Sequence, residues 1–261
     1  MKRVYHLNLT KHEIEGAEMA LLPGDPGRVS KIAEALSAES GGAKKATAQE
    51  IAYKREYRSW LVKARGAAVL VTSTGIGGSA TSIAVEELAM LGVRTFIRVG
   101  TTGAIQRRIK PGDVVISTGA VRLDGASTHY APIEYPAVAD LDVTNALIAG
   151  AKAANIRSHV GITCSTDTFY PGQERADSFT GYVPRRFQGI TKEWEKLNVL
   201  NYEMEAATLF TMSSALGLRA GCVTGVVLER HTTEHVMHED LRRAEEHAIA
   251  VAAAAVSILL K

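Results

Sequence analysis

Cysteine is scarce in this chain of 261 residues, which contains only Cys164 and Cys222. Both lie in apolar runs that we expect to be strands, and a chain of this length and composition does not need a disulfide framework. The N-terminus also lacks the apolar core of a secretory signal. We therefore expect two buried free thiols and, by elimination, a cytoplasmic protein.

An excess of either charge is absent, since 30 Lys and Arg residues face 28 Asp and Glu residues and leave a net charge of +2. This balance gives no electrostatic argument for nucleic acid as the main partner. The apolar segment at residues 248–260 is shorter than the roughly 20 residues that a membrane span requires. It continues a charged helical stretch, so we expect a terminal helix packed on the core and no membrane partner.

Short apolar runs alternate with helical patterns along the chain. This alternation favours a parallel or mixed sheet with helices on its faces. No repeat or linker interrupts it, so we expect one α/β domain over residues 1–261, with a surface loop at 37–48. Strands are predicted at 19–22, 67–73, 95–99, 113–117, 160–164 and 221–228, and helices at 27–36, 79–91, 145–154, 191–197, 203–216 and 239–260.

Glycine-rich segments follow several of these strands, where open α/β sheets bind their ligands. Gly24 with Arg28, and Arg98 with Gly100 and Thr101, would offer backbone N–H groups and guanidinium donors to an anion. Tight turns explain each glycine cluster equally well. A Walker loop is missing, and residues 75–78 match a dinucleotide fingerprint only loosely, so we expect no organic cofactor.

Two further groups of polar residues leave their role open. Glu203 and Glu205 lie at the predicted start of a helix, where they could complement the helix N-terminus or accept hydrogen bonds from a vicinal diol such as ribose. His231, His235 and His238 lie in polar surroundings, which favour a solvated lid over a zinc site.

Six segments become specific when they are taken together. They read LPGDP at 22–26 followed by Arg28, STGIGG at 73–78, RVGTTGA at 98–104, VRLDGAS at 121–127, FYPGQER at 169–175 and NYEMEA at 201–206. Their number and order, over nearly the whole chain, resemble the uridine phosphorylases of the nucleoside phosphorylase family. The resemblance implies an α/β fold with a central mixed, partly barrel-like sheet flanked by helices. It also implies reversible phosphorolysis, in which uridine and phosphate give uracil and ribose 1-phosphate.

The resemblance further assigns a phosphate site, with Arg55 supplied across a subunit interface. Orthophosphate would be a co-substrate that stabilises the positive charge developing on the sugar, without a covalent intermediate or organic cofactor. The phosphate-binding residues would be Gly24, Arg28, Arg55, Arg98 and Thr101.

A nucleoside site follows by the same resemblance. Gln173 and Arg175 would read the uracil carbonyl and ring N–H groups and stabilise the departing base, and Glu205 would hold the ribose hydroxyls. His6 would reach the 5′-hydroxyl in a neighbouring subunit. The substrate-binding residues would be His6, Phe169, Gln173, Arg175, Glu203, Met204, Glu205 and Arg230, and the catalytic residues Arg28, Arg98, Gln173, Arg175 and Glu205.

Substrate choice and assembly are also implied. Related purine enzymes carry an aspartate after the last core strand, where this chain has Glu229 and Arg230, so uridine is favoured. A purine nucleoside phosphorylase, a nucleosidase that uses water and a non-catalytic nucleoside-binding protein remain the alternatives. The family pattern is a homohexamer built as three dimers with shared active sites. Segment 37–53, which precedes Arg55, is longer here than in typical members.

A potassium site at the dimer interface is found in some members. It uses a glutamate, a backbone carbonyl and a serine. Glu56 and Ile76 match the first two ligands, whereas Ala80 stands at the serine position. The cation site therefore lacks one ligand and stays an open alternative.

Overall fold

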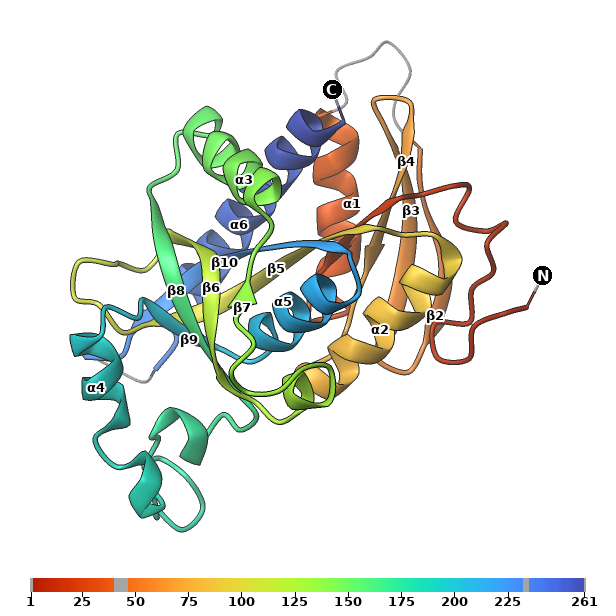
Figure 1. The fold of residues 1–261 in the computed structure, drawn as a ribbon. Helices are drawn as coiled ribbons and strands as arrows, with labels where there is room; N and C mark the ends of the chain where they lie inside the picture. The colour runs from red at the N-terminus through yellow and green to blue at the C-terminus, as the bar shows by residue number, and fades with distance from the viewer. Residues whose placement is uncertain (1, 40–46, 232–234, 261) are drawn as a thin grey trace.

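The strands form one mixed sheet that is partly closed into a barrel (Figure 1). The computed structural model describes residues 2–39, 47–231 and 235–260. Strand β10 pairs with both β5 and β6, which closes a ring of five strands. This is the partly barrel-like sheet that the resemblance implies. The ring consists, in order, of β5 (Thr95–Ala104), β10 (Arg219–Glu229), β6 (Val114–Leu123), β8 (Ser158–Thr166) and β9 (Asn201–Glu203).

An open part of the sheet continues from β5. Its strands, in order from β5, are β1 (Met19–Leu22), β4 (Ala67–Thr72), β3 (Tyr57–Ala64) and β2 (Ala48–Lys54), while β7 (Ala137–Val138) pairs with β6.

Parallel pairing brings the candidate anion-binding segments to one edge. Strands β1, β5 and β10 run parallel, and the pairing register places Arg98 beside Leu22 on one side and Cys222 on the other. The loop that carries Gly24 therefore begins next to Arg98. Ligands bind beyond the carboxyl ends of such strands, so the topology assembles one candidate site from distant parts of the chain.

Helices cover both faces of the sheet (Figure 1). The first face carries α1 (Arg28–Glu39), α3 (Leu141–Ala153) and α6 (His238–Leu259), which pack on one another over one buried apolar cluster. The second face carries α2 (Gly78–Leu91) and α5 (Ala206–Ala215), which lie over another. Helix α4 (Ile190–Lys196) has no buried residue.

Helix α6 confirms the expected terminal helix on the core. Its buried residues include Ala244, Ala248, Val251, Ala252 and Ala255. This spacing of three to four residues forms one apolar stripe, and small alanines allow close approach to the sheet. Within the described ranges, none of the helices has the length and apolar character needed to cross a membrane. Cys164 and Cys222 are buried free thiols, as expected.

Several element boundaries differ from the sequence-based expectation. Helix α5 begins at Ala206, not at 203, because Glu203 ends strand β9 and Glu205 occupies the N-cap position. Strand β5 continues through the glycine segment to Ala104. The predicted loop at 37–48 is shorter, since α1 extends to Glu39 and β2 begins at Ala48. Residues 40–46 lie outside the described residues.

Candidate active site

A cavity of about 550 Å³ opens where the carboxyl ends of β1, β5 and β10 meet the β9–α5 turn. Most of the predicted phosphate, ribose and base residues line it, so the structure brings together side chains that are up to 181 residues apart in sequence (24 to 205). The predicted residues in this wall are Gly24, Arg28, Arg98, Thr101, Phe169, Gln173, Arg175, Glu203, Met204 and Glu205.

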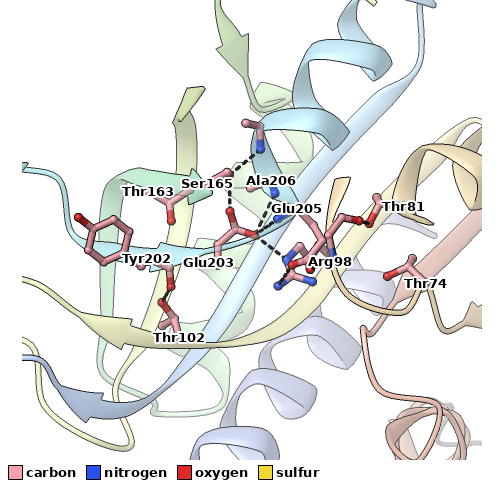
Figure 2. Close-up of polar contacts among 12 residues, drawn as sticks. Thr74, Thr81, Arg98, Thr102, Thr163, Ser165, Tyr202, Glu203, Glu205 and Ala206 are labelled. Atoms are coloured by element: carbon pink, nitrogen blue, oxygen red, sulfur yellow. Dashed lines mark hydrogen bonds and ion pairs between the residues drawn. The ribbon is translucent and has the colours of Figure 1, made fainter. Parts of the chain in front are cut away.

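Arg98 is the centre of a buried ionic cluster (Figure 2). Its Nε atom donates to Glu203 Oε2 at 2.9 Å, and its Nη2 atom pairs with Glu205. Burial disfavours the guanidinium charge, but Glu205 and Glu203 more than offset that effect and raise the pKa of Arg98. Gly100 is needed beside it, because a Cβ there would lie 2.8 Å from Arg98 Nη2.

Glu203 fixes the local backbone as well as Arg98. Its Oε2 atom also accepts from the backbone N–H groups of Glu205 and Ala206, at 2.8 and 2.9 Å. Its Oε1 atom accepts from the Ser165 hydroxyl, and Ser165 Oγ accepts from Ala207 N at 2.8 Å. With both carboxylate oxygens engaged by protein donors and a side chain that is 0% exposed, Glu203 orients Arg98 and the β9–α5 turn.

Glu205 joins this cluster to the start of helix α2. Its Oε1 atom accepts from Gly77 N at 2.5 Å, and Gly77 is the N-cap residue of that helix. Burial raises the pKa of Glu205, while Arg98 opposes the rise. If Arg98 binds another anion, the carboxylate of Glu205 can accept a hydrogen bond from a new donor.

Arg28 supplies a second cation to the same cavity. Its Nε atom lies 3.2 Å from Glu245 Oε1 on helix α6. Burial lowers the pKa of Arg28, an effect that Glu245 opposes and Arg98 reinforces. Two largely buried guanidinium groups that repel each other across one cavity are suited to binding a dianion between them.

The cavity wall also combines polar and apolar groups. The Arg175 guanidinium carbon lies 4.1 Å from the centre of the Phe169 ring, and Gln173 is buried beside them. Tyr202, Leu228 and other apolar side chains complete this part of the wall. A flat heterocycle with carbonyl and N–H groups fits such surroundings.

Four predicted residues do not line the cavity. His6 contacts Glu87 on helix α2, with His6 Nδ1 at 2.8 Å from Glu87 Oε1. Arg55 is exposed in the turn between β2 and β3 and has a φ of 56°. Arg230 donates to the carbonyl oxygen of Gln173, which does line the cavity, at 2.5 Å. Glu56 is the fourth.

The candidate potassium ligands lie close together. A Cβ on Gly75, the neighbour of Ile76, would be 3.0 Å from Glu56 Cγ and 3.7 Å from Ala80 Cβ. The carbonyl oxygen of Ala80 already accepts from the Tyr57 hydroxyl at 3.1 Å. The alanine side chain offers no oxygen, so the donor set is one ligand short and no chemical step is assigned to a cation.

His231, His235 and His238 are not part of any group of three potential metal ligands among the described residues. His231 Nε2 contacts the carbonyl oxygen of Ile105. No group of three or more His, Cys, Asp or Glu side chains that could hold a metal ion occurs in the described part of the chain. Residues 232–234 of the predicted lid lie outside that part.

Sequence patterns did not single out four residues that support the site: Glu87, Ser165, Thr166 and Glu245. Each is a polar residue in a helix or strand whose sequence pattern gives no sign of a functional role. Glu87 and Ser165 are less than 9% exposed, and Thr166 is 1% exposed. A buried polar residue must find a hydrogen-bond partner. A polar residue at a position expected to face the core was therefore the signal that could have identified such residues.

Comparison with known proteins identifies the family of the chain. The phosphorylase superfamily model matches residues 18–261. The chain is 53% identical to a uridine phosphorylase of Haemophilus influenzae, over 100% of both chains. It is 51% identical to the uridine phosphorylase of Salmonella typhimurium, over 98% of both chains. It is 47% identical to that of Thermococcus kodakarensis, over 98% of this chain and 86% of the relative. The chain belongs to the phosphorylase superfamily.

Proposed function

We propose that this protein is a uridine phosphorylase, a pentosyltransferase that converts uridine and phosphate reversibly to uracil and ribose 1-phosphate. The observation that carries the proposal is that one cavity is lined by Arg28, Arg98, Gln173, Arg175 and Glu205, with Glu205 paired to Arg98. The names of the full-length relatives support the same substrate.

Phosphate binds between Arg28 and Arg98, with Gly24 N–H and the Thr101 hydroxyl as further donors. Arg98 is preorganised because Glu203 holds its Nε atom. Phosphate oxygens compete with Glu205 for Arg98 Nη2. Glu205 then accepts hydrogen bonds from the ribose hydroxyls, beside Met204, so phosphate binding prepares the ribose site.

Bond cleavage is driven by electrostatic complementarity. The glycosidic C–N bond breaks as positive charge develops on the sugar, and the phosphate dianion stabilises that charge and attacks the anomeric carbon. The departing uracil carries the electron pair as negative charge, which Arg175 and Gln173 stabilise through the base carbonyl and ring nitrogen groups. Phe169 packs on the base, and Arg230 secures the backbone of Gln173.

The position of His6 and Arg55 outside the cavity supports a shared site. We propose that Arg55 completes the phosphate site, and His6 the ribose site, of a neighbouring subunit, in a homohexamer built as three dimers. The chain then acts as one domain over residues 1–261, in the cytoplasm, in nucleoside salvage. The chemistry requires no organic cofactor, and phosphate is a co-substrate.

A panel of nucleosides assayed with and without phosphate tests the function. We expect uracil release from uridine that depends on phosphate and yields ribose 1-phosphate. Equal release without phosphate would identify a nucleosidase. Release of purine bases alone would overturn the uridine assignment within the family, and binding without turnover would identify a nucleoside-binding protein.

A further inference from the structure

Hydrogen bonds around Gln173 determine which way its side-chain amide faces. Gln173 Nε2 donates to Thr166 Oγ1 at 3.2 Å, and Thr166 Oγ1 donates to the carbonyl oxygen of Thr168, also at 3.2 Å. A carbonyl oxygen can only accept, so the Thr166 hydroxyl hydrogen is directed to Thr168. Thr166 therefore offers Gln173 a lone pair and nothing else.

The amide of Gln173 consequently has one favourable orientation. Its oxygen and nitrogen fill almost the same space, so hydrogen-bond partners decide between the two orientations. A flipped amide would set Gln173 Oε1 against Thr166 Oγ1, two acceptors at a place where Thr166 is 1% exposed and Gln173 is 4% exposed. Buried acceptors without a donor are strongly disfavoured. Nε2 thus faces Thr166, and Oε1 lies on the opposite side of the planar amide.

The backbone of this segment is fixed by the same strand end. The short 3₁₀ turn Pro171–Gln173 follows β8, and Gly172 N donates to Thr168 Oγ1 at 2.9 Å. A Cβ on Gly172 would lie 2.7 Å from Thr168 Oγ1, so glycine allows the turn to rest on the threonine. Arg230 Nη1 also donates to the Gln173 carbonyl oxygen. The orientation of the Gln173 side-chain amide is then determined by its hydrogen bond to Thr166.

We propose that Thr166 is a positioning residue that determines base specificity through Gln173. The inference rests on the proposed function, in which Gln173 meets the pyrimidine ring. Uracil carries a hydrogen on ring nitrogen N3, whereas cytosine carries a lone pair there. An Oε1 atom presented to that nitrogen accepts from uracil and repels cytosine. A site built around one hydrogen-bond polarity rejects the wrong partner far better than an apolar site does.

The test compares Thr166→Val with Thr166→Ser. Valine keeps the volume of threonine but removes the lone pair that orients Gln173, whereas serine keeps the hydroxyl. We expect Thr166→Val to narrow the ratio of the inhibition constants for cytosine and uracil about tenfold, mainly through weaker uracil binding. In Thr166→Val, the kcat/KM for uridine should fall by a similar factor, and the KM for phosphate should stay unchanged. Thr166→Ser should keep the wild-type ratio of the two inhibition constants.

Thr211→Val is the matched control. Thr211 lies on α5, is 0% exposed, and its Oγ1 atom has no hydrogen-bond partner among the described residues. The same change of side chain should therefore leave the ratio unaltered. The inference would be overturned if Thr166→Val kept the wild-type ratio of the inhibition constants for cytosine and uracil. It would also be overturned if Thr211→Val lowered that ratio as much as Thr166→Val. A wild-type protein that does not cleave uridine would overturn the proposed function instead, before any variant is compared.

Discussion

Glu245 on helix α6 lies 3.2 Å from the Nε atom of Arg28, the first residue of helix α1. The two side chains are 12% and 14% exposed, and Lys31 Nζ lies 3.2 Å from the other carboxylate oxygen. The carboxylate thus stabilises an arginine that is buried near Arg98. It also places a negative charge beside the proposed phosphate site, where it opposes the binding of a dianion.

Glu245→Gln should therefore bind phosphate more tightly than the wild type. Glutamine keeps the size and one acceptor of glutamate but removes the opposing charge. A charge change at a partly screened site of this kind is worth about 0.5–1 kcal/mol, so we expect the phosphate KM to fall roughly twofold to fivefold. Steady-state kinetics at saturating uridine measures the effect.

Glu246→Gln is the control for that prediction. Glu246 neighbours Glu245 on the same helix but is 57% exposed and pairs with Arg242 at 2.9 Å. Its removal should leave the phosphate KM unchanged. A rise of the phosphate KM in Glu245→Gln would mean that the carboxylate matters more for orienting Arg28 than for its charge.

The raised pKa of Glu205 predicts a specific dependence of stability on pH. Burial raises this pKa above the value in the unfolded chain, so ionised Glu205 destabilises the fold, and that cost disappears when the group is protonated below its unfolded pKa. Relative to Glu205→Gln, the wild type should gain unfolding free energy as the pH falls from about 8 to about 4.

Urea unfolding of both proteins without phosphate measures this difference. Other titrating groups contribute equally to the two proteins and cancel in the comparison. A difference that does not vary with pH would show that Arg98 keeps the Glu205 pKa at its ordinary value.

The sequence was sufficient to predict that four of the residues proposed to bind phosphate lie together in one cavity. Gly24, Arg28, Arg98 and Thr101 follow strands whose apolar runs are clear, and parallel strands present their carboxyl ends at one edge. The order of elements follows from the same runs. The β2–β3 hairpin was missed because its inward positions are not uniformly apolar: Ser59 is buried and pairs with Thr72 at 3.0 Å.

The supporting contacts could not be predicted because they depend on tertiary packing. Strand β9 has only three residues, too few for a periodic pattern, so Glu203 was assigned to a helix that begins at Ala206. Glu87 lies 81 positions after His6, and Glu245 belongs to the last helix. No local pattern indicates which buried carboxylate faces which arginine or histidine.

Glu87 should act on catalysis through His6. Its Oε1 atom lies 2.8 Å from His6 Nδ1, and its Oε2 atom accepts from Leu7 N at 2.8 Å. A carboxylate only accepts, so Nδ1 carries the hydrogen and Nε2 is the nitrogen left for the ribose 5′-hydroxyl of a neighbouring site. Glu87→Gln should lower kcat/KM for uridine about tenfold, through misorientation of the ring.

A substrate that lacks the 5′-hydroxyl separates this role from general destabilisation. With 5′-deoxyuridine, Glu87→Gln and the wild type should have the same kcat/KM, and Glu87→Gln should add nothing to His6→Ala. Glu86→Gln, the adjacent charge change on α2, serves as the control. Equal losses on both substrates would assign Glu87 a structural role only.

Shared active sites predict complementation between inactive chains. Arg55 is exposed and outside the cavity, whereas Arg98 is buried within it. In a dimer of one Arg55→Ala chain and one Arg98→Lys chain, one site carries both defects and the other carries neither. Random pairing of equal amounts should therefore restore about a quarter of the wild-type activity. Lysine is used at position 98 because it keeps a positive charge between Glu203 and Glu205.

The control for complementation pairs two defects in the same cavity. A mixture of Arg28→Ala and Arg98→Lys chains should recover no activity, because every site then keeps one defective residue of its own chain. Co-expression with two affinity tags yields the mixed assemblies, and uracil release measures their activity. Full inactivity of purified Arg55→Ala and Arg98→Lys heteromers would mean that Arg55 serves the cavity of its own subunit, which would remove the main reason for a shared site.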